Sequence, residues 1–292
     1  MVFFPLAPEV LSKIDLESTL YSGQSFRWQS TEQGHYGVLG DNVLRINLIG
    51  GGVDLQSAPA DPEYVFPRLA SYLRLDDDLT AIQNEIDVDS RIHWAIDSYR
   101  GLRLLRQDPW ECLVAFICSA TSNIPRISRT IEAIAGAYGS PIDFGSERRY
   151  TFPGPERLID VSESAFRELG MGFRARYLVS AVEMVHQKFD LVRMREYSYE
   201  ETYPLLLQFP GVGEKLADCT MLFSLEKLRA FPIDRWMRRA INEWYPEVNS
   251  FSYRDLQNWA FDYFGNYAGY AQMYLFHARR TLGHSNVSDL AE

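Results

Sequence analysis

A lysine and an aspartate, nineteen residues apart, are the two side chains in this sequence best suited to covalent chemistry. Lys215 follows the glycine-containing stretch "FPGVG" at residues 209–213 and falls in the first turn of a predicted helix. A cation is unfavourable there, because the positive end of the helix dipole lies beside it. Either an anion from outside contacts Lys215, or its pKa is lowered so that it acts as a neutral amine.

Asp234 stands in the stretch "AFPIDRW", at the position where the next helix is predicted to begin. An isolated aspartate at such a position is most often only a helix cap. A carboxylate and an amine on one pocket, however, suit attack at the anomeric carbon of a sugar. The carboxylate would stabilise a developing oxocarbenium ion, and the amine would capture it.

Cys219 lies four residues after Lys215 and therefore on the same side of the predicted helix. A thiolate at this position would oppose a lowered lysine pKa and form an ammonium–thiolate pair instead. Both alternatives stay open at the level of sequence.

The residues before the lysine predict a phosphate-binding hairpin. Gly211, Val212 and Gly213 lie between two apolar helices, and the turn resembles the helix-hairpin-helix of DNA-binding proteins. The exposed amides at a helix start bind anions, and such a hairpin holds the sugar–phosphate backbone without reading bases. The hairpin carbonyls are also candidate ligands for a monovalent or divalent cation. A non-catalytic DNA-binding module would need only this hairpin.

The elements that position these residues predict an α+β fold. Short aromatic and β-branched stretches at 19–28, 35–40, 42–49 and 53–57 predict an antiparallel sheet, and helical patterns begin at Asp61. We expect residues 1–105 to form this sheet domain with its helices. Residues 106–292 are expected to form an all-helical body that carries the hairpin. Its helices are predicted from Asp108 onward and at 124–138, 162–169, 174–188, 198–208, 214–225, 234–244, 252–264 and 267–281.

Charge and composition limit the class of protein. The net charge is −10, but residues 1–99 carry 6 basic and 15 acidic side chains, whereas residues 100–292 carry 23 and 24. Local arginine clusters in the second part could therefore contact phosphates. No apolar run reaches membrane-spanning length, and three scattered cysteines fit neither a metal site nor an iron–sulfur cluster. We expect a cytoplasmic, nucleoid-associated monomer without cofactor or membrane partner; a nuclear or organellar location stays open.

Several separated stretches resemble one enzyme family. They are "SGQSFRW" (22–28), "GLRLLRQDPWECLVAFICS" (101–119), "LGMGFRARY" (169–177), the hairpin with Lys215, "ADC" and Asp234, and "YAGYAQMYLF" (267–276). The sequence is similar to the 8-oxoguanine DNA glycosylase/AP lyases of the helix-hairpin-helix superfamily that ends in a Gly-Pro-Asp signature, here "FPID". The resemblance implies base excision repair on duplex DNA, in which the damaged nucleotide is flipped into a pocket.

The resemblance also implies roles for individual residues. Lys215 would be the nucleophile at C1′, forming a Schiff base that decays by β-elimination, and Asp234 would assist departure of the base. The backbone carbonyl of Gly23 would accept a hydrogen bond from the N7 hydrogen of the oxidised guanine. Gln272 would read the Watson–Crick edge of that base. Cys219 and Phe276 would sandwich the ring.

Other positions depart from the family pattern. Thr121 stands where an asparagine contacts the orphaned cytosine, with Asn123 retained, and Phe173 replaces a tyrosine wedge. Arg126 and Arg174 match the two arginines that grip cytosine, so we expect a preference for cytosine that is looser than in the asparagine-bearing enzymes. In the pocket, Trp236 replaces a common histidine and Phe223 a common methionine.

Two other functions remain as alternatives. A monofunctional alkylpurine glycosylase would share the fold and the aspartate, but that class lacks a lysine at position 215. The non-catalytic DNA-binding module would lack the lysine–aspartate pair.

Overall fold

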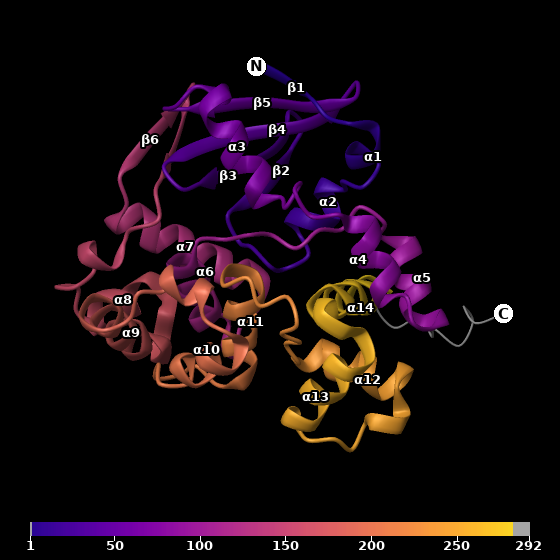
Figure 1. The fold of residues 1–292 in the computed structure, drawn as a ribbon. Coiled ribbons are helices and arrows are strands. Elements are labelled where there is room, and N and C mark those ends of the chain that lie inside the picture. The colour runs from indigo at the N-terminus through magenta and orange to yellow at the C-terminus, as the bar shows by residue number, and fades with distance from the viewer. Residues whose placement is uncertain (1, 283–292) are drawn as a thin grey trace.

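The computed structural model describes residues 2–282, so the last ten residues of the predicted helical body lie outside the described residues. A five-stranded sheet stands at one end of the molecule and two groups of helices at the other (Figure 1). The strands of the sheet are β1 (Val2–Pro5), β2 (Trp28–Thr31), β3 (Gly34–Leu39), β4 (Asn42–Ile49) and β5 (Gly52–Ala58). The short helices α1 (Pro8–Leu11) and α2 (Leu16–Leu20) and the longer α3 (Pro62–Tyr72) accompany it.

The sheet is antiparallel throughout, with the order β1-β5-β4-β3-β2. Its sequence alternation places different side chains on its two faces. Leu44 and Ile46 of β4 join the core beneath α2 and α3, whereas Val43 faces the opposite side. Both faces are therefore covered, although only one is covered by helices.

The helices of the rest of the chain begin at α4 (Leu79–Ile86) and α5 (Ser90–Ser98). They continue with α6 (Pro109–Ser119), α7 (Ile124–Tyr138), α8 (Glu163–Phe166), α9 (Ala175–Gln187), α10 (Tyr199–Leu206), α11 (Glu214–Ser224), α12 (Arg235–Trp244), α13 (Tyr253–Phe264) and α14 (Ala268–Leu282). Helix α6 begins as predicted, with the Asp108 carboxylate accepting from the Glu111 amide at 2.9 Å and proline in its first turn. Its residues from Cys112 to Cys118 are all buried, so α6 lies inside the largest core.

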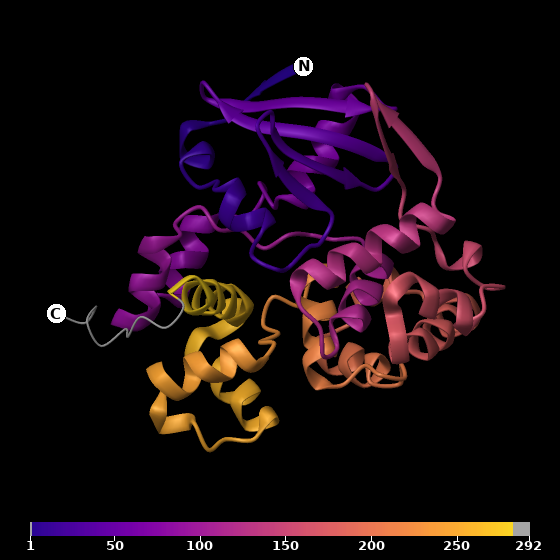
Figure 2. The ribbon, with the colours of Figure 1, turned by 180° about the vertical axis from the view of Figure 1, so that it is seen from behind.

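Two predictions about local structure were wrong. The stretch 19–28, predicted as a strand, forms the end of α2, an irregular turn and only the first residue of β2. The region after residue 105 also contains a hairpin of β6 (Pro141–Phe144) and β7 (Glu147–Tyr150), which no helical pattern predicts. Figure 2 shows this hairpin reaching from the helices up to the sheet. There Ile142 joins Tyr36 and Val38 of β3 in a small core on the second face of the sheet.

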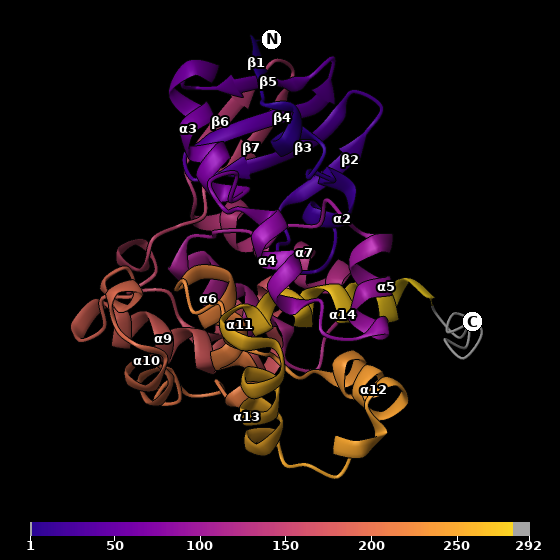
Figure 3. The same ribbon diagram turned by 45° about the vertical axis from the view of Figure 1, so that its right-hand side comes forward.

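The division at residue 105 stays a prediction, and the packing crosses it in both directions. Helices α4 and α5 come before residue 105, but their buried residues Ile82 and Ile92 belong to the core of the helical body. Both helices pack on α14, and Figure 3 shows α5 beside α14. Within residues 2–282, no helix is long and apolar enough to cross a membrane.

Candidate active site

The hairpin at residues 209–213 joins α10 to α11, and its two glycines have different physical requirements. Gly211 has φ +82°, and a Cβ there would lie 2.4 Å from the Tyr177 ring. Gly213 has an ordinary negative φ and is the last residue before α11. A Cβ at Gly213 would meet no described atom within 4 Å. Between them, the Val212 side chain is buried in the core. Gly211 is thus required by packing, whereas the open surface at Gly213 leaves room for a ligand beside the first amides of α11.

Lys215 lies in the first turn of α11 and is half-buried. Its Nζ is 5.2 Å from the centre of the Phe116 ring. Burial raises the pKa of the Cys219 thiol to about 12, although the neighbouring Lys215 ammonium lowers it. The thiol therefore stays protonated at neutral pH, and the ammonium–thiolate pair does not form.

Asp234 is the N-cap residue just before α12, and its carboxylate accepts a hydrogen bond from the Met237 amide at 2.8 Å. This bond fixes one carboxylate oxygen as a helix cap. The same side chain lines a cavity that Lys215 also lines. Asp234 thus has the cap role and a position beside the lysine.

A cavity of about 60 Å³ brings together the predicted catalytic residues and most of the residues predicted for the damaged-base pocket. It is lined by Gly23, Gln24, Phe116, Lys215, Cys219, Phe223, Pro232, Asp234, Gln272, Met273 and Phe276. Phe223 stacks on Phe116 with ring centres 5.6 Å apart and planes 15° apart. The cavity wall is therefore mainly apolar and aromatic, with the lysine and the aspartate as its charged groups.

Gln272 contributes a polar group to this wall. Its side chain is only 4 % exposed, and its Nε2 donates to the Pro232 carbonyl at 3.0 Å. Its Oε1 is buried and has no hydrogen-bond partner among the described residues. Buried polar atoms are nearly always paired, so this oxygen is a candidate acceptor for a donor on a ligand.

The turn that carries Gly23 is held from two sides. Gln24, fully buried, donates to the carbonyls of Thr19 and Arg103 at 2.9 Å each. Arg280 of α14 donates to the carbonyls of Tyr21 and Ser22, at 2.6 and 2.9 Å. Hydrogen bonds therefore connect the stretch 22–28 directly to the stretch 101–119. They also connect it to α14.

Arg280 was not among the predicted site residues. It lies four residues after Phe276 on the same helix, and its guanidinium is 5.8 Å from that ring. The spacing of four could have indicated it, because residues four apart share a helix face. A Cβ at Gly23, where φ is +92°, would lie 3.0 Å from Arg280 Nη1.

A larger groove, of about 1140 Å³, adjoins the cavity and shares five lining residues with it: Gly23, Phe116, Lys215, Asp234 and Phe276. One wall is the connection from α6 to α7, and the other is the start of α12. Besides Lys215, its basic residues are Arg235, Arg238, Arg239 and Arg280. A groove with several arginines provides a positive surface on a protein whose net charge is −10.

Trp236 lines this groove and not the small cavity. Its ring lies 5.1 Å from the Arg239 guanidinium. The predicted contact of Trp236 with the damaged base stays a prediction; in the described structure Trp236 lies in the first turn of α12 and lines the groove.

The residues predicted for the opposite strand lie along the α6–α7 connection and before α9. Asn123 caps α7 by accepting from the Arg126 amide at 3.0 Å, and the Arg126 side chain is exposed. Phe173 is 44 % exposed. Arg174 is 3 % exposed, and its guanidinium donates to three backbone carbonyls, those of Ala120, Thr121 and Met171.

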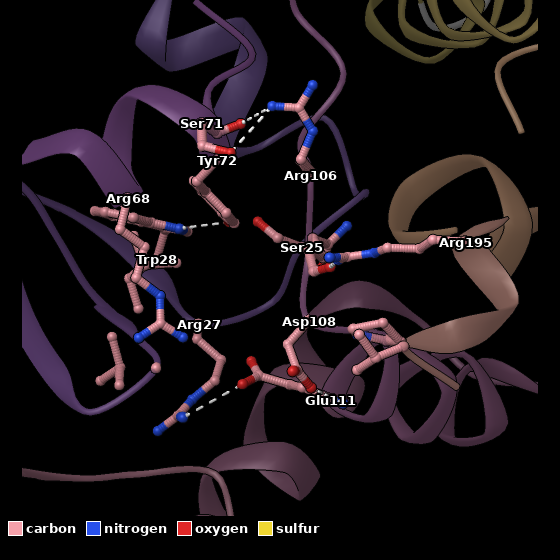
Figure 4. A pocket seen from close by; sticks show the side chains of 16 residues that line it. Ser25, Arg27, Trp28, Arg68, Ser71, Tyr72, Arg106, Asp108, Glu111 and Arg195 are labelled. Carbon is pink, nitrogen blue, oxygen red and sulfur yellow. Dashed lines mark hydrogen bonds and ion pairs between the residues drawn. The ribbon is translucent and has the colours of Figure 1, made fainter. Parts of the chain in front are cut away.

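A second cavity, of about 230 Å³, lies between the sheet and the helical body (Figure 4). It contains four arginines but neither Lys215 nor Asp234. Arg106 pairs with Asp76 at 3.0 Å, and Arg27 pairs with Glu132 at 2.8 Å and faces Glu111 at 3.9 Å. Because two of its four arginines are already paired with carboxylates of the protein, we assign this cavity to the junction between the sheet and the helices.

Among residues 2–282, no cluster of three or more histidine, cysteine, aspartate or glutamate side chains could hold a metal ion. A cation held by the hairpin carbonyls stays a prediction.

Comparisons with known proteins show which family the chain resembles. Residues 8–113 match the family described as 8-oxoguanine DNA glycosylase, N-terminal domain. The chain is 36% identical to a probable N-glycosylase/DNA lyase from Methanothermobacter thermautotrophicus, over 66% of this chain and 68% of the relative. It is 30% identical to the N-glycosylase/DNA lyase OGG1 of Arabidopsis thaliana, over 91% of this chain and 77% of the relative.

The fold is also similar to a solved structure. The Clostridium acetobutylicum 8-oxoguanine glycosylase/lyase, in complex with double-stranded DNA containing cytosine opposite 8-oxoguanine, superposes with a TM-score of 0.86. The two chains are 32% identical, and the match covers 92% of each.

Proposed function

The chain belongs to the 8-oxoguanine DNA glycosylase/lyase family, and we propose that it removes 8-oxoguanine from duplex DNA and cleaves the strand at the resulting abasic site. The observation that carries this proposal is a single cavity lined by Lys215, Asp234 and Gln272. A binding module without catalysis needs neither the lysine nor the aspartate. A monofunctional alkylpurine glycosylase has no use for an amine at this place.

The reaction follows from the two charged groups. Lys215, once its ammonium group has given up a proton, attacks C1′ of the flipped nucleotide with its amine nitrogen while the bond from C1′ to the base breaks. The electron pair of that bond leaves with the base, which takes up a proton. Asp234, fixed as the cap of α12, stabilises the positive charge that develops on the sugar. The amine nitrogen, now bonded to C1′, loses a proton; the C1′–O4′ bond of the sugar ring then breaks, O4′ takes up a proton, and a protonated imine remains. Loss of a proton from C2′ then drives β-elimination, which breaks the C3′–O bond and releases the 3′ phosphate.

Recognition of the base uses polar groups in an otherwise apolar cavity. The free Oε1 of Gln272 would accept from the donor atoms on the Watson–Crick edge of a guanine-type base. The carbonyl of Gly23, in a turn fixed by Gln24 and Arg280, would accept from the N7 hydrogen that distinguishes 8-oxoguanine from guanine. One such hydrogen bond contributes roughly 1–3 kcal/mol of discrimination when the wrong base leaves a buried group unpaired. The neutral Cys219 thiol and Phe276 would contact the two faces of the ring.

The DNA would lie along the groove. The arginines at the start of α12 line this groove and would bind phosphates, as would the backbone amides after Gly213. Phe173, exposed and apolar, would wedge into the duplex where the base has left it. Arg126 and Arg174 would contact the orphaned cytosine.

The test is covalent trapping. The protein is incubated with borohydride and a duplex that contains one 8-oxoguanine opposite cytosine, beside an undamaged duplex and the Lys215→Gln variant. We expect an adduct on the damaged duplex only, and none with the variant. An adduct that persists in Lys215→Gln would contradict the role of this lysine. Bound DNA without adduct or excision would favour the binding module.

A further inference from the structure

Asp218 is a buried carboxylate in α11 that the proposed mechanism does not use. It lies one helical turn after Lys215, and its side chain is fully buried. Its Oδ1 accepts from the Tyr199 hydroxyl at 2.9 Å. Its Oδ2 accepts from the Tyr253 hydroxyl at 2.6 Å and from Gln257 Nε2 at 2.8 Å. One carboxylate oxygen therefore binds α10, and the other binds two residues of α13.

The two α13 residues also hold the segment that precedes Asp234. Gln257 makes two hydrogen bonds to the backbone of Phe231, one from the Phe231 amide at 3.3 Å and one to its carbonyl. The Tyr253 hydroxyl accepts from the Ile233 amide at 3.4 Å. Residues 231–233 have no regular secondary structure. These side chains, together with Gln272 at Pro232, therefore fix the path of the backbone into Asp234.

We propose that Asp218 is a positioning residue, which sets Asp234 relative to Lys215 through Tyr253 and Gln257. We call the hydrogen bonds from Asp218 through Tyr253 and Gln257 to the backbone of residues 231–233 the relay. Because Lys215 and Asp218 belong to the same helix, the relay connects Asp234 to the helix that carries the nucleophile. Without the carboxylate, the Tyr253 hydroxyl and the Gln257 amide lose the acceptor that orients them. The backbone at 231–233 then gains freedom, and the Asp234 carboxylate loses its fixed place beside the sugar.

This inference rests on the proposed function, because it assumes that Asp234 assists departure of the base. It makes a specific prediction, since departure of the base is needed for excision but not for cleavage at an abasic site that already exists. Small displacements of a catalytic group reduce rates by about 10- to 100-fold. Disturbing the relay should therefore slow excision by that factor and leave cleavage of a preformed abasic site within about three-fold.

The chain offers a matched pair of variants. Tyr253→Phe removes the hydroxyl that connects Asp218 to Ile233. Tyr199→Phe removes a hydroxyl from the same carboxylate, but on the side that faces α10. Both changes delete one oxygen from a tyrosine that contacts Asp218, so a purely structural role predicts similar effects for the two. Gln257→Met and Asp218→Asn provide further interruptions of the relay, of which Asp218→Asn is the most disruptive to folding.

The measurements are the single-turnover excision rate on 8-oxoguanine opposite cytosine, cleavage of a preformed abasic site, DNA affinity and the melting temperature. We expect Tyr253→Phe and Gln257→Met to lower excision selectively and Tyr199→Phe to leave it unchanged. Equal losses in Tyr253→Phe and Tyr199→Phe, or parallel losses of excision and abasic-site cleavage, would overturn the proposal. So would an unchanged excision rate in Tyr253→Phe. Wild-type protein in the same assays separates these outcomes from failure of the proposed function, because in that case the wild type itself excises nothing.

Discussion

Arg174 and Thr121 are joined by a hydrogen bond of 2.8 Å from the guanidinium to the backbone carbonyl, so a residue expected to contact cytosine also shapes the loop beside it. The same guanidinium holds Ala120 and Met171. The α6–α7 connection thus depends on a buried arginine for its conformation.

Arg174→Lys keeps the charge but loses the planar fork that reaches several carbonyls. We expect a loss of about 1–3 kcal/mol in the free energy of unfolding, because the carbonyls of Ala120, Thr121 and Met171 lose a charged donor. Discrimination for cytosine should also fall. The control is Arg126→Lys, whose side chain is exposed; it should leave the melting temperature unchanged. Urea unfolding and excision opposite the four bases measure both effects. Equal stability of the two variants would contradict the structural role of Arg174.

Thr121 has φ +52°, a conformation that β-branched residues rarely adopt. Such strain costs roughly 1–3 kcal/mol, and asparagine tolerates the conformation better. Thr121→Asn should therefore raise the melting temperature and strengthen the preference for cytosine, whereas Thr121→Val, which keeps the branched side chain, should do neither. The wild type should prefer cytosine moderately. Comparable excision opposite all four bases would show that the arginines alone do not select it.

The two hairpin glycines allow binding to be separated from folding. Gly211→Ala would place a Cβ against the Tyr177 ring and hold alanine at a positive φ, so it should destabilise the protein by more than about 1 kcal/mol. Gly213→Ala meets no atom of the described residues within 4 Å and should change stability by only about 0.5 kcal/mol. We expect Gly213→Ala nevertheless to weaken binding of duplex DNA, because the added methyl group lies where the phosphate backbone would approach. Normal DNA affinity in a folded Gly213→Ala protein would argue against that placement.

Glu111 provides a test of electrostatics away from the active site. Burial raises the pKa of its carboxyl to about 7 from an ordinary value of 4.5, although Arg27 lowers it. Between these pH values the folded state binds more protons than the unfolded state, so this group makes the protein less stable as the pH rises. Glu111→Gln mimics the protonated form. It should match the wild type below pH 4.5 and become the more stable protein as the pH approaches 7, as followed by melting temperature across pH. A difference that is independent of pH would contradict the raised pKa.

Much of the fold can be predicted from the sequence, because the local helix and strand patterns agree with the tertiary structure. Asp108 with Pro109 predicts the start of α6, and the predicted helices at 124–138 and 252–264 appear with boundaries close to those of α7 and α13. The β-branched stretches 42–49 and 53–57 became β4 and β5. At the site, the cap role of Asp234 and the common side of Lys215 and Cys219 follow from helix geometry alone.

The remaining features depend on contacts between distant residues. The stretch 19–28 is rich in aromatic residues, as a strand would be, but Arg280 and Gln24 hold its backbone carbonyls in an irregular turn. Hairpin β6–β7 has four-residue strands, too short for a clear alternation. The hydrogen-bond donors to Asp218 could not be inferred, because they lie 19, 35 and 39 residues away.

Elements on each side of residue 105 pack into the core of the other part, and this packing has a consequence for how the chain unfolds. The β6–β7 hairpin seals one face of the sheet, and α4 and α5 complete the core around α14. Ion pairs also join the two parts, because Glu132 of α7 pairs with Arg27, beside the sheet, and with Arg149 of β7. Cutting the chain at this point would leave an uncovered apolar surface on each fragment. Sheet and helices are therefore interlocked as one cooperative unit, and heat or denaturant should melt them together in a single transition.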